Sequence, residues 1–180
     1  VVMQLIRVSS LALLLFAGCD QFQRTPPASI PEGWRVYFSP HGGCTEAIVG
    51  ALNSATNSVL VQAYGFTSAP LAGALRDAHK RGVKVSAILD NSNLTDKYSE
   101  ADFLAHAGIR TLIDKKHGIA HNKVMIIDEA VVITGSFNFT KAAEERNAEN
   151  LLVIQDRQLA QQYLANWRKH EAHSETYSGR

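Results

Sequence analysis

The stretch that decides the fold is residues 119–139, which read IAHNKVMIIDEAVVITGSFNF. It contains two apolar runs, Lys123–Asp128 and Ala130–Thr134. Only the acidic pair Asp128-Glu129 separates them, and this spacing predicts a β-hairpin. The fold can therefore be worked out from this hairpin toward both ends of the chain.

The predicted hairpin gathers four polar side chains. Residues two apart on a strand project from the same face of a sheet, and this relation joins His121 to Lys123 and Ser136 to Asn138. A tight hairpin folds the second pair back alongside the first. Gly135, directly before Ser136, allows the two backbones to approach closely.

These four side chains suit a tetrahedral phosphate. Lys123 supplies positive charge, and Ser136 and Asn138 supply neutral hydrogen-bond donors. His121 can act as nucleophile, base or acid near neutral pH. The sequence places no acidic cluster or histidine pair where it would hold a catalytic metal. We therefore expect phosphate chemistry without a metal or another cofactor.

Outside the hairpin, strand-like apolar runs alternate with amphipathic helical patterns. The expected strands are Trp34–Phe38, Val59–Phe66, Val83–Leu89, Ile109–Ile113 and Asn150–Gln155. The expected helices are Thr45–Ala55, Pro70–Arg81, Tyr98–Ala107 and Gln158–His170. Repeated strand–helix–strand units followed by a hairpin predict an α/β fold, in which helices flank a mixed β-sheet on both faces.

The composition is that of one soluble globular domain. The chain has 180 residues, of which 46% are hydrophobic and 19% are charged, and its net charge is +1. Arg7 is the only charged residue among residues 1–19, so the chain without them is formally neutral. No overall basic field exists to attract a polyanion, and any attraction for phosphate must be local.

Residues 1–19 predict export. Arg7 precedes an apolar run that is too short to span a membrane and that ends in small residues. Its last residues, FAGC, resemble a bacterial lipobox, which would place a lipid anchor at Cys19; ordinary signal-peptidase cleavage remains the alternative. Residues 20–32 are rich in proline and predict a linker, and residues 33–175 form the domain. We expect a periplasmic or secreted bacterial protein, with or without the anchor.

The spacing of the hairpin residues resembles a known motif. The pattern His121-x-Lys123-(x4)-Asp128-(x6)-Gly135-Ser136-x-Asn138 is similar to the HKD motif of the phospholipase D superfamily. Three more segments resemble the short, single-motif bacterial endonucleases of the Nuc type: Tyr37-Phe38-Ser39-Pro40, Ala63-Tyr64-Gly65-Phe66-Thr67 and Asn147-Ala148-Glu149-Asn150. The resemblance extends over about residues 33–170 and implies the phospholipase D/nuclease fold.

The resemblance implies a two-step hydrolysis of a phosphodiester through a phosphohistidine. The superfamily uses two HKD motifs at one site, and this chain has a single motif. It is therefore expected to form a homodimer that brings two copies of His121 together. Chemistry supports this requirement, because one imidazole cannot be the neutral nucleophile and the protonated acid at once.

The resemblance also implies a role for each residue. His121 is nucleophile or acid according to the subunit, whereas Lys123, Ser136 and Asn138 hold phosphate oxygens. Glu149 corresponds to a carboxylate that hydrogen-bonds the catalytic histidine and selects its tautomer.

Some residues keep two interpretations. Asp128 either takes part in catalysis or has a structural role at the hairpin. Lys115 and His117 either add positive charge where substrate enters or belong to a solvated loop. The remaining helical histidines are expected at the surface, namely His79, His106, His170 and His173.

Three functions follow. The first is a secreted, metal-independent endonuclease that cuts DNA and RNA with little sequence preference. The second is a phospholipase D that acts on membrane lipids, although a domain this short has little material for an acyl-chain channel. The third is a non-catalytic module that binds phosphate or nucleic acid. It is disfavoured because every position of the motif is intact.

Overall fold

The computed structural model describes residues 30–180. The predicted export signal, residues 1–19, and most of the predicted linker, residues 20–32, lie outside this range. Within the described range, no helix has both the length and the hydropathy needed to cross a membrane.

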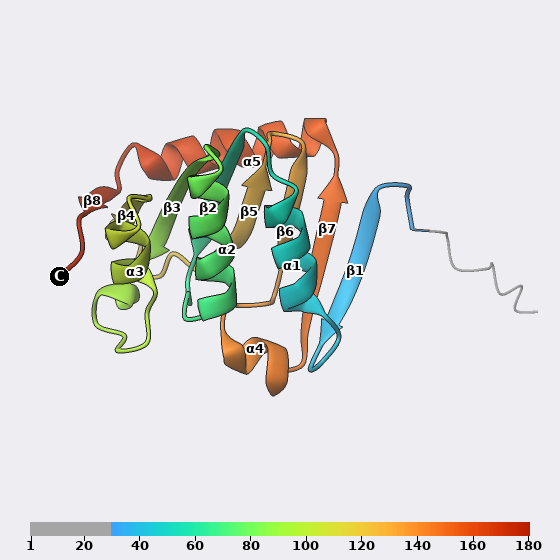
Figure 1. Cartoon of the computed structure of the whole chain (residues 1–180), viewed down its shortest axis with the longest axis horizontal. Helices are drawn as coiled ribbons and strands as arrows, with labels where there is room; N and C mark the ends of the chain where they lie inside the picture. The colour runs from blue at the N-terminus through green and yellow to red at the C-terminus, as the bar shows by residue number, and fades with distance from the viewer. Residues whose placement is uncertain (1–29) are drawn as a thin grey trace, which may run out of the picture.

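A mixed sheet forms the centre of the domain, as the sequence predicts (Figure 1). Its strands follow the order β1-β7-β6-β5-β2-β3-β4-β8. They are β1 (Trp34–Ser39), β2 (Ser58–Ala63), β3 (Lys84–Asp90), β4 (Arg110–Asp114), β5 (Lys123–Ile127), β6 (Val131–Gly135), β7 (Glu149–Gln155) and β8 (Glu175–Tyr177). Strands β2, β3 and β4 are parallel, and the other pairs are antiparallel.

Helices cover both faces of this sheet. They are α1 (Cys44–Asn53), α2 (Ala69–Lys80), α3 (Ala101–His106), α4 (Lys141–Glu145) and α5 (Arg157–Glu171), with a short 3-10 helix at Asn91–Leu94. In Figure 1, α1, α2 and α3 lie in front of the sheet and α5 lies behind it. Two separate apolar cores result, one on each face.

Strand β5 shows how one sequence supplies both cores. Its five residues are all buried, because side chains alternate between two covered faces. Met125 and Ile127 enter the core beneath α1 and α2. Val124 and Ile126 enter the other core, which Trp167 of α5 completes. The strand that begins at the motif lysine is therefore fixed from both sides.

The structure differs from the prediction in its short elements. Helix α4 and strand β8 were not predicted, since five and three residues are too few to show a periodic pattern. Helix α3 begins at Ala101 and not at Tyr98. Strand β8 also continues past residue 175, the predicted end of the domain, as far as Tyr177.

One edge of the sheet collects the polar residues. Ala63 at the end of β2 pairs with Lys123 at the start of β5. On its other side, Ala63 pairs with Leu89, directly before Asp90 of β3. Asp90 in turn pairs with Asp114 at the end of β4. The carboxyl ends of the parallel strands and the beginning of β5 therefore meet at this edge.

Candidate active site

His121 and Lys123 lie at this edge beside one aromatic ring. The His121 ring is exposed, and its centroid is 4.7 Å from that of Tyr64. Lys123 is only 7% exposed; its Nζ donates to the His121 carbonyl at 2.9 Å and lies 5.1 Å from the Tyr64 ring centroid. Tyr64 follows β2, so the β2–β5 pairing brings it here. Sequence reasoning did not assign Tyr64 to the site, although it belongs to one of the resembling segments.

The Lys123 ammonium sits where water is largely excluded. Burial lowers its pKa, and the carboxylates of Glu149 and Asp90 oppose this shift without cancelling it. An ammonium has three donors, and the described residues engage one of them, at the His121 carbonyl. A phosphate oxygen can accept the others. This geometry fits the predicted role of Lys123.

Ser136 and Glu149 form a pair of their own. Ser136 Oγ donates to Glu149 Oε2 at 2.6 Å and accepts from the Asn150 amide at 3.0 Å. The other oxygen, Glu149 Oε1, accepts from Asn147 Nδ2 at 3.0 Å. Within one copy of residues 30–180, Glu149 is not hydrogen-bonded to His121, because β7, which begins at Glu149, neighbours β6 and not β5. A bond from Glu149 to the His121 of a second copy stays a prediction.

The β5–β6 pairing places Ser136 and Asn138 near Lys123, as predicted. Val124 pairs with Thr134, so Lys123 and Gly135 are the next residues along the two strands. Gly135 has φ +151°, and a Cβ there would lie 2.3 Å from the Asn150 carbonyl oxygen. Only glycine permits this approach, and it is made to β7, whereas a close approach within the hairpin was expected.

Asn138 has an incomplete set of hydrogen bonds. Its Oδ1 is buried and has no partner among the described residues. A Cβ added at Gly65 would lie 3.6 Å from this oxygen, so the amide faces the segment that carries Tyr64. An unpaired buried polar group costs about 1–3 kcal/mol. This oxygen is an acceptor, so a phosphate oxygen cannot satisfy it, and the predicted contact of Asn138 with phosphate would use its NH2 group instead.

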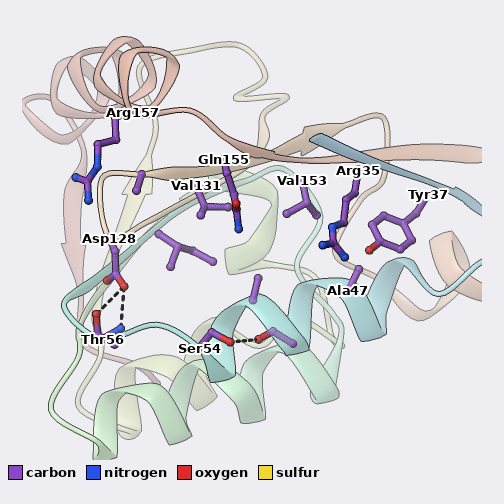
Figure 2. Close-up of a pocket in the computed structure, with 14 residues that line it drawn as sticks. Arg35, Tyr37, Ala47, Ser54, Thr56, Asp128, Val131, Val153, Gln155 and Arg157 are labelled. Atoms are coloured by element: carbon purple, nitrogen blue, oxygen red, sulfur yellow. Dashed lines mark hydrogen bonds between the residues drawn. The ribbon is translucent and has the colours of Figure 1, made fainter. Parts of the chain in front are cut away.

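Asp128 lies just beyond the other end of β5, about 17 Å from Lys123, because five residues of extended strand separate the two. Its Oδ2 accepts from Thr56 N and Oγ1, both at 2.9 Å, and its Oδ1 accepts from the amides of Asn57 and Ser58, both at 2.8 Å. Figure 2 shows this end of the sheet, with a cavity of about 610 Å³ that Asp128 helps to line. The geometry favours the structural interpretation of Asp128 over a catalytic one.

Lys115 and His117, in the loop after β4, bind acidic residues of the protein itself. Lys115 forms an ion pair with Glu175, and His117 Nδ1 lies 2.9 Å from Asp114 Oδ2. Contact of Lys115 or His117 with substrate stays a prediction. The surface assignment of His170 and His173 is wrong: their side chains are only 15% and 21% exposed.

Both histidines bind Asp114, at the end of an apolar strand. Two sequence features could have indicated this contact. The two histidines are three residues apart near the end of a helix, and an aspartate ends a buried strand. Nothing in the sequence connects these two features.

Comparisons with known proteins agree with this geometry. A family model described as the PLD-like domain of cardiolipin synthase matches residues 48–170. A Rickettsia felis protein named phospholipase D is 52% identical over 135 residues, which cover 75% of this chain and 68% of that protein. The chain belongs to the phospholipase D superfamily.

Two further relatives extend the comparison. The structure of Nuc from Salmonella typhimurium, described as a phospholipase D family member, matches with a TM-score of 0.77 and 38% identity, over 80% of this chain and 97% of Nuc. The mitochondrial cardiolipin hydrolase of Canis lupus familiaris is 33% identical over 79% of this chain and 56% of its own length. This member of the superfamily is a phosphodiester hydrolase.

Proposed function

We propose that this phosphodiesterase is an exported endonuclease, which cleaves DNA and RNA without a catalytic metal at a site shared by two copies of the chain. The observation that carries the proposal is the isolation of His121. The ring beside it is Tyr64, and no second imidazole pairs with it among residues 30–180. Because hydrolysis through a phosphohistidine needs both a nucleophile and an acid, a second copy must supply the other imidazole.

The proposed first step forms a phosphohistidine. Neutral His121 of one copy attacks phosphorus, and the bond from phosphorus to the leaving oxygen breaks. The protonated His121 of the second copy gives its proton to that oxygen. Lys123 balances the charge on the non-bridging oxygens, and the Asn138 side-chain NH2 group donates a hydrogen bond to one of them.

The second step returns both histidines to their starting states. The imidazole that gave up its proton takes one from water, and the resulting hydroxide attacks phosphorus. The phosphorus–nitrogen bond breaks, and His121 of the first copy is free again. No oxidant, reductant or metal ion is needed for atoms and charge to balance.

Exposed apolar side chains near the site support the two-copy arrangement. Ile119, two residues before His121, is 61% exposed. Phe38 is 63% exposed, and it pairs in the sheet with Asn150, whose amide binds Ser136. Burying two large apolar side chains in each copy favours association on the face that bears His121.

The dimer is tested with Ile119→Asp, which puts a charge on that face. We expect analytical ultracentrifugation to show a dimer for the unchanged protein and mainly a monomer for the variant, with a parallel loss of turnover. Lys141→Asp, on exposed α4, is the matched control. A monomer with full activity would overturn the shared site.

An open site favours a nucleic acid as substrate. His121 is exposed beside Tyr64, and the other residues expected at the site, Ser136, Asn138 and Glu149, are polar. An extended polyanion can lie across such an edge, whereas nothing around His121 is built to enclose an acyl chain. The match to nearly the full length of Nuc also supports this choice.

Phospholipid remains a second candidate, since the curated relatives are named phospholipase D and cardiolipin hydrolase. The purified protein is incubated in EDTA with plasmid DNA, with RNA, and with vesicles of phosphatidylcholine or cardiolipin. We expect cleavage of both nucleic acids and its loss in His121→Asn, with His106→Gln as the control at an exposed histidine. Hydrolysis of vesicles alone would establish the lipid alternative, and no hydrolysis of any substrate would contradict both.

A further inference from the structure

Four ligand-type side chains converge at the end of β4, outside the hydrolytic site. They are Asp114, His117, His170 and His173. The Asp114 side chain is fully buried, and its Oδ2 lies 2.9 Å from His117 Nδ1, 2.9 Å from His170 Nδ1 and 3.2 Å from His173 Nε2. All four ligand atoms lie within 4.8 Å of one another.

The fold builds this cluster from three separate segments. Asp114 ends β4, and His117 belongs to the loop that follows. His170 occupies the last turn of α5, and His173 lies in the turn after it. Strand β8 then pairs antiparallel with β4, with Ile113 opposite Glu175, so the chain that leaves α5 must return to the end of β4.

Hydrogen bonding alone does not account for the cluster. A carboxylate oxygen has about two lone-pair sites, yet three imidazole nitrogens point at Asp114 Oδ2. The other oxygen, Oδ1, is already occupied by the backbone amides of Lys116 and His117, at 3.0 and 3.3 Å. The three rings also crowd one another, with centroids 4.8 to 5.4 Å apart. A single cation among the four ligand atoms would satisfy all of them with neutral imidazoles.

The donor set and its spacing suit zinc. Three imidazoles and a carboxylate are ligands that Zn²⁺ takes in tetrahedral sites, with bonds of about 2.0–2.2 Å and hence about 3.3 Å between ligand atoms. The distances from Asp114 Oδ2 to the nitrogens are within a few tenths of an ångström of that value. The four ligand atoms lie within 4.8 Å of one another, so the nitrogens would move closer together on binding the ion.

The carboxylate is also held ready as a ligand. The Asp114 side chain is fully buried at the end of β4, so it has little freedom to turn away from the three imidazoles. The backbone amides on Oδ1 fix the orientation of the group, as outer hydrogen bonds commonly do for metal ligands.

We propose that Asp114, His117, His170 and His173 bind one Zn²⁺ per chain, as a structural site. The ion would tie the loop that leads to His121 to the end of α5. His117, which would bind the ion, lies in this loop four residues before His121. The loop is also held at Ala120, directly before His121, whose amide donates to Asp90 Oδ2 at 2.7 Å. Zinc here would stabilise the loop and the C-terminal segment and would take no part in the chemistry at phosphorus.

Direct binding measurements test the site independently of hydrolysis. Tag-free protein is stripped with EDTA, dialysed and titrated with Zn²⁺ in a calorimeter. We expect one equivalent per chain, and a rise in Tm of about 5–10 °C when free Zn²⁺ is 100 times Kd. Co²⁺ in place of Zn²⁺ should give the intense visible absorption of a tetrahedral site.

Variants separate this site from adventitious binding. His173→Gln, in a partly exposed turn, should lower Zn²⁺ affinity at least tenfold and abolish the tetrahedral Co²⁺ spectrum. His170→Gln should do the same from inside α5, whereas His106→Gln should change neither. Equal binding by all four proteins, a stoichiometry of one half, or no binding would each overturn the proposal. Loss of hydrolysis in EDTA by protein that is still folded would contradict the structural role and assign the ion to catalysis.

Discussion

The two ends of strand β5 differ in how completely their polar groups are hydrogen-bonded. At its start, His121 is exposed, Lys123 is buried with one hydrogen bond from its ammonium, and the Asn138 oxygen has no partner among the described residues. Beyond its end, Asp128 accepts four hydrogen bonds from residues 56–58. One motif thus spans both ends: polar groups at the first keep unused hydrogen-bonding capacity, and those at the second are satisfied by the protein. Function and stability should therefore respond in opposite ways to changes at the two ends.

The largest effect is expected from His121→Asn. Because His121 is the proposed nucleophile and is exposed, its loss should lower kcat by about 10³-fold or more and leave the fold unchanged. Steady-state hydrolysis and thermal unfolding are measured on the same protein. A Tm lowered by more than a few degrees would show that this end also carries stability and would break the comparison.

Lys123→Met should follow, with a loss in kcat of about 10²–10³-fold, since it removes the charge proposed to balance the phosphate oxygens. Burial lowers the pKa of Lys123 and marks a cost of keeping its ammonium from water. An apolar side chain of similar length avoids that cost, so Tm should stay the same or rise. Hydrolysis assays and calorimetry decide this; a large fall in Tm would mean that Lys123 holds the site together.

Asp128→Ala should lower the stability of the fold and leave kcat nearly unchanged. The amides of Thr56, Asn57 and Ser58 lose their acceptor, and unfolding in urea should be easier by about 1–2 kcal/mol. At a temperature where the variant is folded, kcat should change less than about threefold. Asp77→Ala, at an exposed ion pair, serves as the control with little expected effect. A hundredfold fall in kcat in folded protein would restore a catalytic role for Asp128.

The smallest effect is in the dependence of stability on pH. Burial raises the pKa of Asp128, but the amides of Ser58, Thr56 and Asn57 outweigh it and hold the pKa below its usual range. The unfolded carboxyl titrates near pH 3.9. The stabilisation is therefore complete above about pH 4 and is lost as the pH falls through the lower, folded value. Urea midpoints for the protein and Asp128→Asn should differ at pH 7 and converge toward pH 3; a constant difference would contradict this.

Local patterns were enough to predict most of the site. The i, i+2 spacing of His121 with Lys123 and of Ser136 with Asn138, joined by a short turn, correctly indicated a hairpin that brings them together. The requirement for Gly135 was equally local. Long strands and helices were found because their periodicity extends over several residues, whereas α4 and β8 were too short to show any.

Partners distant in the sequence were not predictable in this way. Within one chain Glu149 binds Ser136, because the strand order places β7 beside β6, and its expected bond to His121 stays a prediction for the two-copy site. His170 and His173 were expected in solvent, but they bind Asp114, which lies 56 and 59 residues away. The pairing of β8 with β4 brings them together, and a three-residue strand gives no pattern from which to infer it.

The sequence by itself therefore determined the superfamily and the hairpin, and it selected the residues that are expected to meet phosphate. All of these depend on spacings within about twenty residues, which the geometry of a strand converts directly into position. Only the tertiary structure decided which partner each carboxylate binds. Asp128 binds the residues at the start of β2, Glu149 binds Ser136, and Asp114 binds the three histidines. That choice follows from the order of strands in the sheet, which the burial of two apolar faces selects and no local pattern encodes.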